Sequence, residues 1–112
     1  MKDKEKIWFE HIYDSANKAV KFAEGKNIND LRNNDMLYLA ILKSIEIIGE
    51  ASNRISEETR MQFNNIPWRE IIAMRNRLVH GYFDVDYEIL WNVVERRLPE
   101  LILNVKEILE ML

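Results

Sequence analysis

Hydrophobic residues recur at helical spacing in two long stretches of the N-terminal half. The first stretch covers about residues 4–24 and the second about residues 34–55. Gly25 is suited to end the first helix and Asn34 to cap the second. The polar segment 26–34 between them is predicted to be a loop. The buried face of the first helix is expected at Ile12, Ala16, Ala19 (or Val20) and Ala23, with Ile7 and Phe9 before them, and that of the second at Leu37, Ile41, Ile45, Ile48, Ala51 and Ile55.

The C-terminal half predicts shorter helices. A capped helical turn is expected over residues 56–63, and Pro67 fits the first turn of a helix over residues 68–80, where no amide proton is required. The pattern as a whole predicts an all-α fold, an antiparallel helical bundle of about four to five helices, in a single domain over residues 1–112. Further boundaries are expected at Gly81 (end of the 68–80 helix), Asp84 or Asp86 (cap of a helix over about 87–98) and Pro99 (start or kink of the last helix), with Ile71, Ile72, Leu78 and Val79 as core candidates.

Composition supports this fold class and indicates the cellular compartment. The 112 residues include three glycines and two prolines, too few for the turns of a many-stranded β fold. Cysteine is absent, so no disulfide or thiolate metal site is expected. The N-terminus lacks the apolar run of a signal peptide, and no stretch approaches the roughly 18–20 apolar residues that span a bilayer. A cytoplasmic protein is therefore expected.

Charge is unevenly distributed along the chain. The net charge is −3, which argues against a broad polyanion-binding surface. Residues 60–83 nevertheless contain four arginines against one glutamate, a local net charge of +3. A phosphate contact, if there is one, is expected in this segment.

Arg75, His80 and Tyr82 stand close together in this basic segment. On an uninterrupted helix, five residues of separation turn Arg75 and His80 about 140° apart. If Gly81 adopts the left-handed conformation, the helix ends there and the His80 ring no longer has to follow the side-chain positions of a regular helix. The three side chains could then share one pocket. Histidine carries protons near neutral pH, a guanidinium stabilises phosphoryl oxygens, and tyrosine binds phosphate or stacks on a base, which together suit cleavage of RNA. The same residues also fit an ordinary helix end without a functional site. In that case the helix dipole favours the histidine, and the tyrosine packs on the last turn of the helix.

The Arg75-x4-His80-x-Tyr82 pattern resembles the Arg-x4–6-His-x-Tyr signature of HepT-like toxins in the HEPN (higher eukaryotes and prokaryotes nucleotide-binding) superfamily. The resemblance covers roughly residues 35–100. Its further motifs, in the family's order and spacing, are residues 45–51 (Ile-Glu-Ile-Ile-Gly-Glu-Ala), Ile66-Pro67-Trp68, Met74-Arg75-Asn76, Val85-Asp86, Trp91 and Leu98-Pro99.

This resemblance implies a HEPN-like fold and an endoribonuclease toxin that uses 2′-hydroxyl attack and needs no metal or cofactor. Arg75 and His80 would be the catalytic pair, supported by Asn76. Tyr82 would be the tyrosine to which the partner antitoxin, a minimal nucleotidyltransferase, attaches AMP in a type VII-like toxin–antitoxin system. The family works as a homodimer whose two motifs face a shared cleft. A two-fold axis would supply a second His80 as the other proton carrier, although water could serve instead.

Several other residues keep more than one interpretation. Glu46 and Glu50 share a helix face and could be a metal pair or an acid and a base, but Glu50 could instead bond Arg75 or Asn76 and orient the site. His11 is expected to be a surface residue. Trp8, Trp68 and Trp91 are expected to be core or interface anchors, and Arg96-Arg97 a solvated pair or an extension of an RNA track.

Two functions compete with the ribonuclease toxin. One is a non-catalytic substrate-binding or regulatory subunit of a nucleotidyltransferase, and the other is a purely structural helical dimer.

Overall fold

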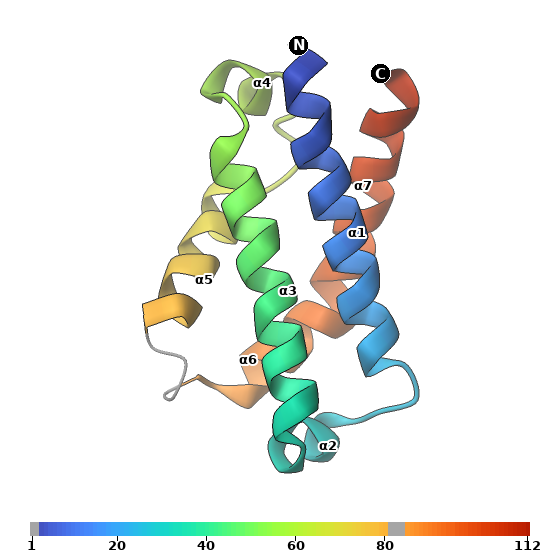
Figure 1. Cartoon of the computed structure of the whole chain (residues 1–112), viewed down its shortest axis with the longest axis vertical. Helices are drawn as coiled ribbons and strands as arrows, with labels where there is room; N and C mark the ends of the chain where they lie inside the picture. The colour runs from blue at the N-terminus through green and yellow to red at the C-terminus, as the bar shows by residue number, and fades with distance from the viewer. Residues whose placement is uncertain (1–2, 81–84) are drawn as a thin grey trace.

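Four long helices form an antiparallel bundle in the computed structural model, which describes residues 3–80 and 85–112 (Figure 1). They are α1 (Lys6–Ala23), α3 (Asp35–Arg54), α5 (Trp68–His80) and α7 (Leu98–Met111). Helix α3 packs between α5 and α1, and α1 packs on α7. No strand occurs among the described residues, so the predicted all-α bundle is confirmed.

Shorter helices connect the long ones. They are the 3-10 turn η1 (Asp3–Glu5), α2 (Ile28–Asn33), α4 (Glu57–Gln62), α6 (Tyr87–Asn92) and the π-helical turn η3 (Val93–Arg97), which joins α6 to α7.

The prediction of a loop over residues 26–34 was wrong, because α2 lies there. A capping box begins this helix: the Asn27 side chain accepts from the backbone amide of Asp30, and the Asp30 carboxylate accepts from the amide of Asn27. The helix is too short to show a hydrophobic period, which is why the pattern did not predict it.

The predicted boundaries agree with the structure where it describes them. Gly25 ends α1 in the left-handed region, at a φ of 73°. Asn34 accepts from the amide of Leu37 and begins α3, and Asp86 caps α6. Gly81 and Asp84 lie outside the described residues. Pro99 stands in the first turn of α7.

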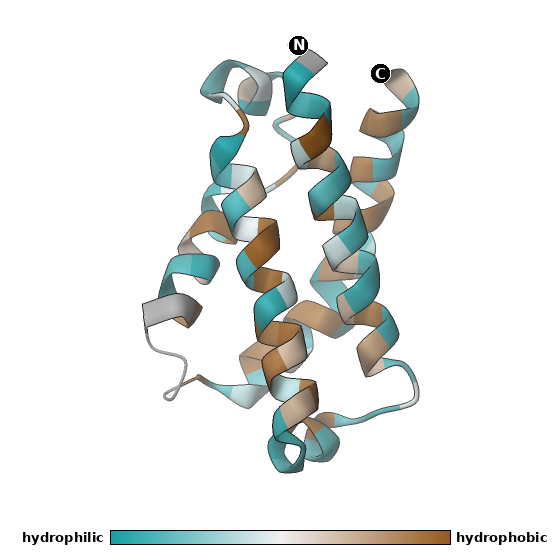
Figure 2. Cartoon of the chain, in the orientation of Figure 1, coloured by the Kyte–Doolittle hydropathy of each residue, from teal (hydrophilic) through white to brown (hydrophobic). Residues whose placement is uncertain are grey.

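Aromatic and aliphatic side chains fill the centre of the bundle. Phe9 on α1 contacts Phe63 and Trp68 edge to face, with ring centroids 5.9 Å apart in each pair. The predicted buried face of α3 is confirmed at all six positions, and Figure 2 shows hydrophobic and hydrophilic residues alternating along the long helices. Ile7 is 50% exposed, contrary to expectation, because two residues of separation put it about 200° around the helix from the buried Phe9.

No helix in the described ranges has both the length and the apolar character needed to cross a bilayer.

A buried carboxylate fixes the start of α1 against the segment after α3. The Glu5 side chain accepts a hydrogen bond from the amide of Ser56 at 2.6 Å and a short one from the hydroxyl of Thr59. Glu5 and Thr59 are both buried. These bonds align the end of α3 with the first turns of α1.

Replacing Glu5 with alanine should lower the free energy of unfolding by about 2–3 kcal/mol, because buried donors would lose a charged acceptor. Urea denaturation checks this, with Glu10→Ala as the control at an exposed position of the same helix. We expect the control to change stability by no more than about 0.5 kcal/mol. Equal effects of the two substitutions would contradict the anchoring role of Glu5.

Candidate functional site

The stem of Arg75 lies directly on the backbone of α3 at Gly49. A Cβ atom built on Gly49 would lie 2.1 Å from the Cβ of Arg75 and 2.4 Å from its Cγ. Any larger residue at position 49 would therefore have to push α5 away, because the Cβ of Arg75 moves only with its backbone. Gly49 allows this close approach and determines where the side chain of Arg75 begins.

Two acceptors hold the guanidinium group of Arg75. Its Nη2 donates to Oε2 of Glu50 at 2.6 Å, and its Nη1 donates to Oδ1 of Asn76 at 3.0 Å. The Arg75 side chain is 26% exposed, so the charged head still reaches the surface. An ionised acceptor gives the stronger kind of hydrogen bond, and two acceptors leave the group little rotational freedom. The contact between Glu50 and Arg75 that the sequence suggested is therefore present.

The structure brings together three of the predicted site residues: Arg75, Asn76 and Glu50. Helix α5 ends at His80, but the His80 side chain, Gly81 and Tyr82 lie outside the described residues. The expected convergence of the arginine, histidine and tyrosine therefore stays a prediction.

Glu46 and Glu50 have different cationic neighbours. Glu46 contacts Lys43 on its own helix at 3.5 Å, whereas Glu50 contacts Arg75 and, through Oε1, lies 3.9 Å from Nη2 of Arg54. Within residues 3–80 and 85–112, no three histidine, aspartate or glutamate side chains gather as a metal site would require. Each carboxylate has a cationic neighbour of its own.

Sequence reasoning missed two participants, Gly49 and Arg54. A glycine inside a helix costs about 1 kcal/mol relative to alanine, so a glycine in the middle of α3 is a signal of close packing that could have been used. The position of Arg54 has no comparable sequence signal, because it depends on how α1 lies against α3.

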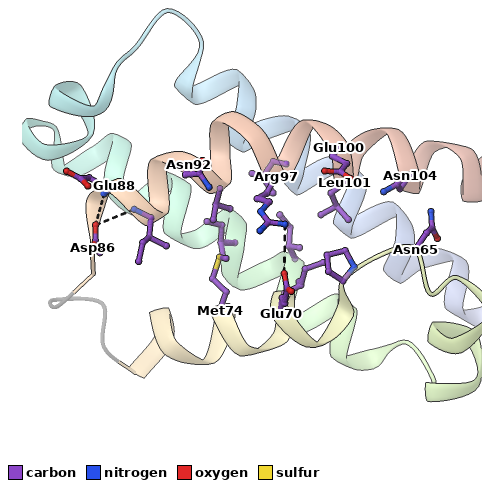
Figure 3. A pocket seen from close by; sticks show the side chains of 17 residues that line it. Asn65, Glu70, Met74, Asp86, Glu88, Asn92, Arg97, Glu100, Leu101 and Asn104 are labelled. Carbon is purple, nitrogen blue, oxygen red and sulfur yellow. Dashed lines mark hydrogen bonds and ion pairs between the residues drawn. The ribbon is translucent and has the colours of Figure 1, made fainter.

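A groove of about 570 Å³ separates α5 from α6, η3 and α7 (Figure 3). Arg75, Asn76 and Glu50 are not among its lining residues. Glu70 of α5 and Arg97 of η3 face each other across it at 4.0 Å (Figure 3). Apolar side chains line it, among them Ile45, Ile48, Ile71, Met74 and Leu101, together with the carboxylates Glu70, Asp86, Glu88 and Glu100 and the single cation Arg97.

This groove has two consequences for the site. Four carboxylates against one arginine make its lining unfavourable for a polyanion. Ile71, predicted as a core residue, is only half-buried, because it lies on the side of α5 that faces the groove. Helix α5 is therefore positioned chiefly by its packing on α3, where Gly49 and Glu50 contact Arg75.

Replacing Gly49 with alanine should destabilise the protein by about 1–3 kcal/mol through overpacking, although helix propensity alone would favour alanine. Urea denaturation checks the sign. The control is the same substitution in an Arg75→Gly background, which lacks the clashing Cβ and should be stabilised by alanine at position 49. A gain in stability from Gly49→Ala in the wild-type background would contradict the close approach.

Comparison with known proteins identifies the family to which the chain belongs. The family model described as "Ribonuclease HepT-like" matches residues 12–108. "Putative RNase MJ1380" of Methanocaldococcus jannaschii is 38% identical over 96 residues, covering 86% of this chain and 88% of that protein. "Putative RNase TTE0752" of Caldanaerobacter subterraneus subsp. tengcongensis is 37% identical, with 92% of both chains covered. "Probable ribonuclease HepT" of Thermococcus cleftensis is 34% identical, over 90% of this chain and 92% of that protein.

No solved structure matches this chain significantly. The family match extends over most of the chain and includes every residue of the candidate site. The chain therefore belongs to the HepT-like ribonuclease family.

Proposed function

We propose that this chain is an endoribonuclease that cleaves RNA by attack of a 2′-hydroxyl on the neighbouring phosphate, with Arg75 and His80 as the catalytic pair. The observation that carries the proposal is the fixed guanidinium of Arg75 on the surface of a protein that belongs to a ribonuclease family. As the hydroxyl attacks, negative charge builds on the phosphoryl oxygens. A positive group that is already oriented stabilises that charge without reorganising during the reaction.

Glu50 and Asn76 act in this proposal by positioning Arg75. Both accept hydrogen bonds from its outer nitrogens. Arginine has five N–H donors, so two bonds to the protein leave donors for a phosphate. The Glu50 carboxylate stabilises the orientation of the guanidinium but also opposes an incoming anion, so the phosphate has to bind the donors of Arg75 that Glu50 and Asn76 do not occupy.

The proton transfers require an acid and a base, and His80 supplies one of them. In a homodimer whose two motifs face a shared cleft, the second His80 would supply the other. No metal ion or cofactor enters this mechanism.

We further propose that the chain is the toxin of a toxin–antitoxin pair and acts in the cytoplasm as one domain. Its antitoxin would be a minimal nucleotidyltransferase that attaches AMP to Tyr82. Tyr82 stands two residues after His80 in the sequence. A bulky anionic group there would block the phosphate site and repel RNA, which explains how the modification would neutralise the toxin.

The purified protein should cleave single-stranded RNA in the presence of EDTA. His80→Ala and Arg75→Ala should each lower kcat by about 10²- to 10³-fold, because each removes one transition-state interaction. Gel analysis of RNA fragments measures this, with Lys106→Ala, an exposed position of α7, as the control that retains activity. Intact RNA after incubation with the folded wild-type dimer would favour the non-catalytic subunit instead.

Incubation with ATP and a cognate minimal nucleotidyltransferase should add AMP at Tyr82 and abolish cleavage. Peptide mass spectrometry locates the modification. Tyr82→Phe should remove the acceptor hydroxyl and escape neutralisation, whereas Tyr13→Phe, on α1, should still be neutralised. Adenylyl groups found only on other residues would contradict the assignment of Tyr82.

A further inference from the structure

A second guanidinium group lies beside the candidate site. Arg54, in the last turn of α3, places Nη2 3.9 Å from Oε1 of Glu50. The other oxygen of the same carboxylate accepts the bond from Arg75. The two cations are thus separated by a single carboxylate group. The side chain of Arg54 is 57% exposed and therefore accessible to a ligand.

An aromatic ring supports this second guanidinium. The Cζ of Arg54 lies 5.2 Å from the ring centroid of Trp8, on α1. Trp8 is half-buried and packs against the hydrophobic core, so its ring is held in place. His11 contacts the same ring edge to face, with centroids 5.4 Å apart at an interplanar angle of 85°.

These residues form a continuous row across three neighbouring helices, which we call the Arg75–Trp8 row. It runs from Arg75 on α5 through Glu50 and Arg54 on α3 to Trp8 and His11 on α1. Its direction follows the packing of the bundle, in which α3 lies between α5 and α1.

The row lies on the opposite side of α3 from the acidic groove. At 100° per residue, Glu50 and Arg54 are about 140° and 180° around the helix from Ile45, which lines that groove. The groove lining has an excess of carboxylates, whereas the row has two permanent cations against one carboxylate. An RNA strand is therefore favoured along the row and disfavoured in the groove.

We propose that the Arg75–Trp8 row is a subsite for single-stranded RNA, in which Arg54, supported by Trp8, stacks on the base of a nucleotide next to the phosphate held by Arg75. The proposal rests on the proposed function, because it takes RNA as the substrate. Proteins recognise unpaired RNA by stacking its bases on aromatic rings or on guanidinium planes, and such stacking tolerates any base. The shared carboxylate of Glu50 keeps the two guanidinium groups within reach of adjacent nucleotides.

The alternative is that the pair of Arg54 and Trp8 only ties α1 to α3. Lysine distinguishes the two roles, because it keeps the positive charge but has no plane on which a base can stack. A charge-only contact would tolerate Arg54→Lys, whereas a stacking contact would not.

The test measures binding of a short fluorescent oligouridylate by anisotropy in a His80→Ala background, so that the RNA stays intact. Arg54→Ala should weaken binding about 5- to 100-fold, the loss expected for one stacked base. It should also reduce the slope of log affinity against log salt by about 0.7, because one cation is lost. Arg54→Lys should keep the wild-type slope and remain weakened several-fold. Trp8→Leu should weaken binding in the same direction, since it removes the support for Arg54.

Lys106→Ala, on α7, is the matched control and should bind as the parent does. Circular dichroism melting checks that each variant is folded. In the catalytically intact background, Arg54→Ala should raise KM with kcat within about threefold, because a remote stacking contact contributes to binding rather than to chemistry.

Three results would overturn the subsite. Unchanged binding by Arg54→Ala would mean that the contact with Trp8 is structural, and full recovery in Arg54→Lys would mean that only charge matters. In both cases the proposed function would still be supported if the wild-type protein cleaves RNA. A wild-type protein that neither binds nor cleaves RNA would instead refute the proposed function, and the subsite with it.

Discussion

The close approach of α3 and α5 at Gly49 is the constraint on which the rest of the site depends. It puts the first carbons of the Arg75 side chain in the space that a side chain at position 49 would occupy. From that starting point the guanidinium reaches Glu50, one residue further along α3, at 2.6 Å. One helix therefore supplies both the space for the stem of Arg75 and the acceptor for its head. On its other side α5 is separated from α7 by the groove, so α7 contributes little to the position of Arg75.

The two sides of α3 differ in the sign of the charge that prevails there. The protein is acidic overall, with a net charge of −3, and the charged residues that line the groove beside α5 are four carboxylates and one arginine. The guanidinium groups of Arg75 and Arg54 both adjoin Glu50 on the opposite side of α3. A polyanion would meet a more favourable field beside these two guanidinium groups than in the groove. In the proposed function, binding of RNA therefore depends on where these cations lie and not on the net charge of the protein.

Much of the fold could be predicted from the sequence, because the hydrophobic period of α1 and α3 and the residues Gly25, Asn34 and Asp86 act locally. Helix α2 was missed, since six residues are too few for a period and its cap depends on reciprocal bonds between Asn27 and Asp30. At the site, the motif identified Arg75, and the contact with Glu50 was one of the alternatives that the sequence left open. The glycine inside α3 was a signal of close packing that sequence reasoning did not use. The role of Arg54 could not be predicted, because it depends on where Trp8 of α1 lies against α3.

The central claim is that Arg75 is held by Glu50 and is the group that meets the phosphate. Nitrogen-15 NMR of the arginine side chains tests it most directly, in protein titrated with a non-cleavable 2′-deoxy oligonucleotide. We predict separate, slowly exchanging Nη signals for Arg75 in the free protein, which shift on binding and which merge in Glu50→Ala as the guanidinium rotates freely. Arg75 signals that rotate freely in the wild-type protein, or that stay unchanged while the oligonucleotide binds, would contradict the account.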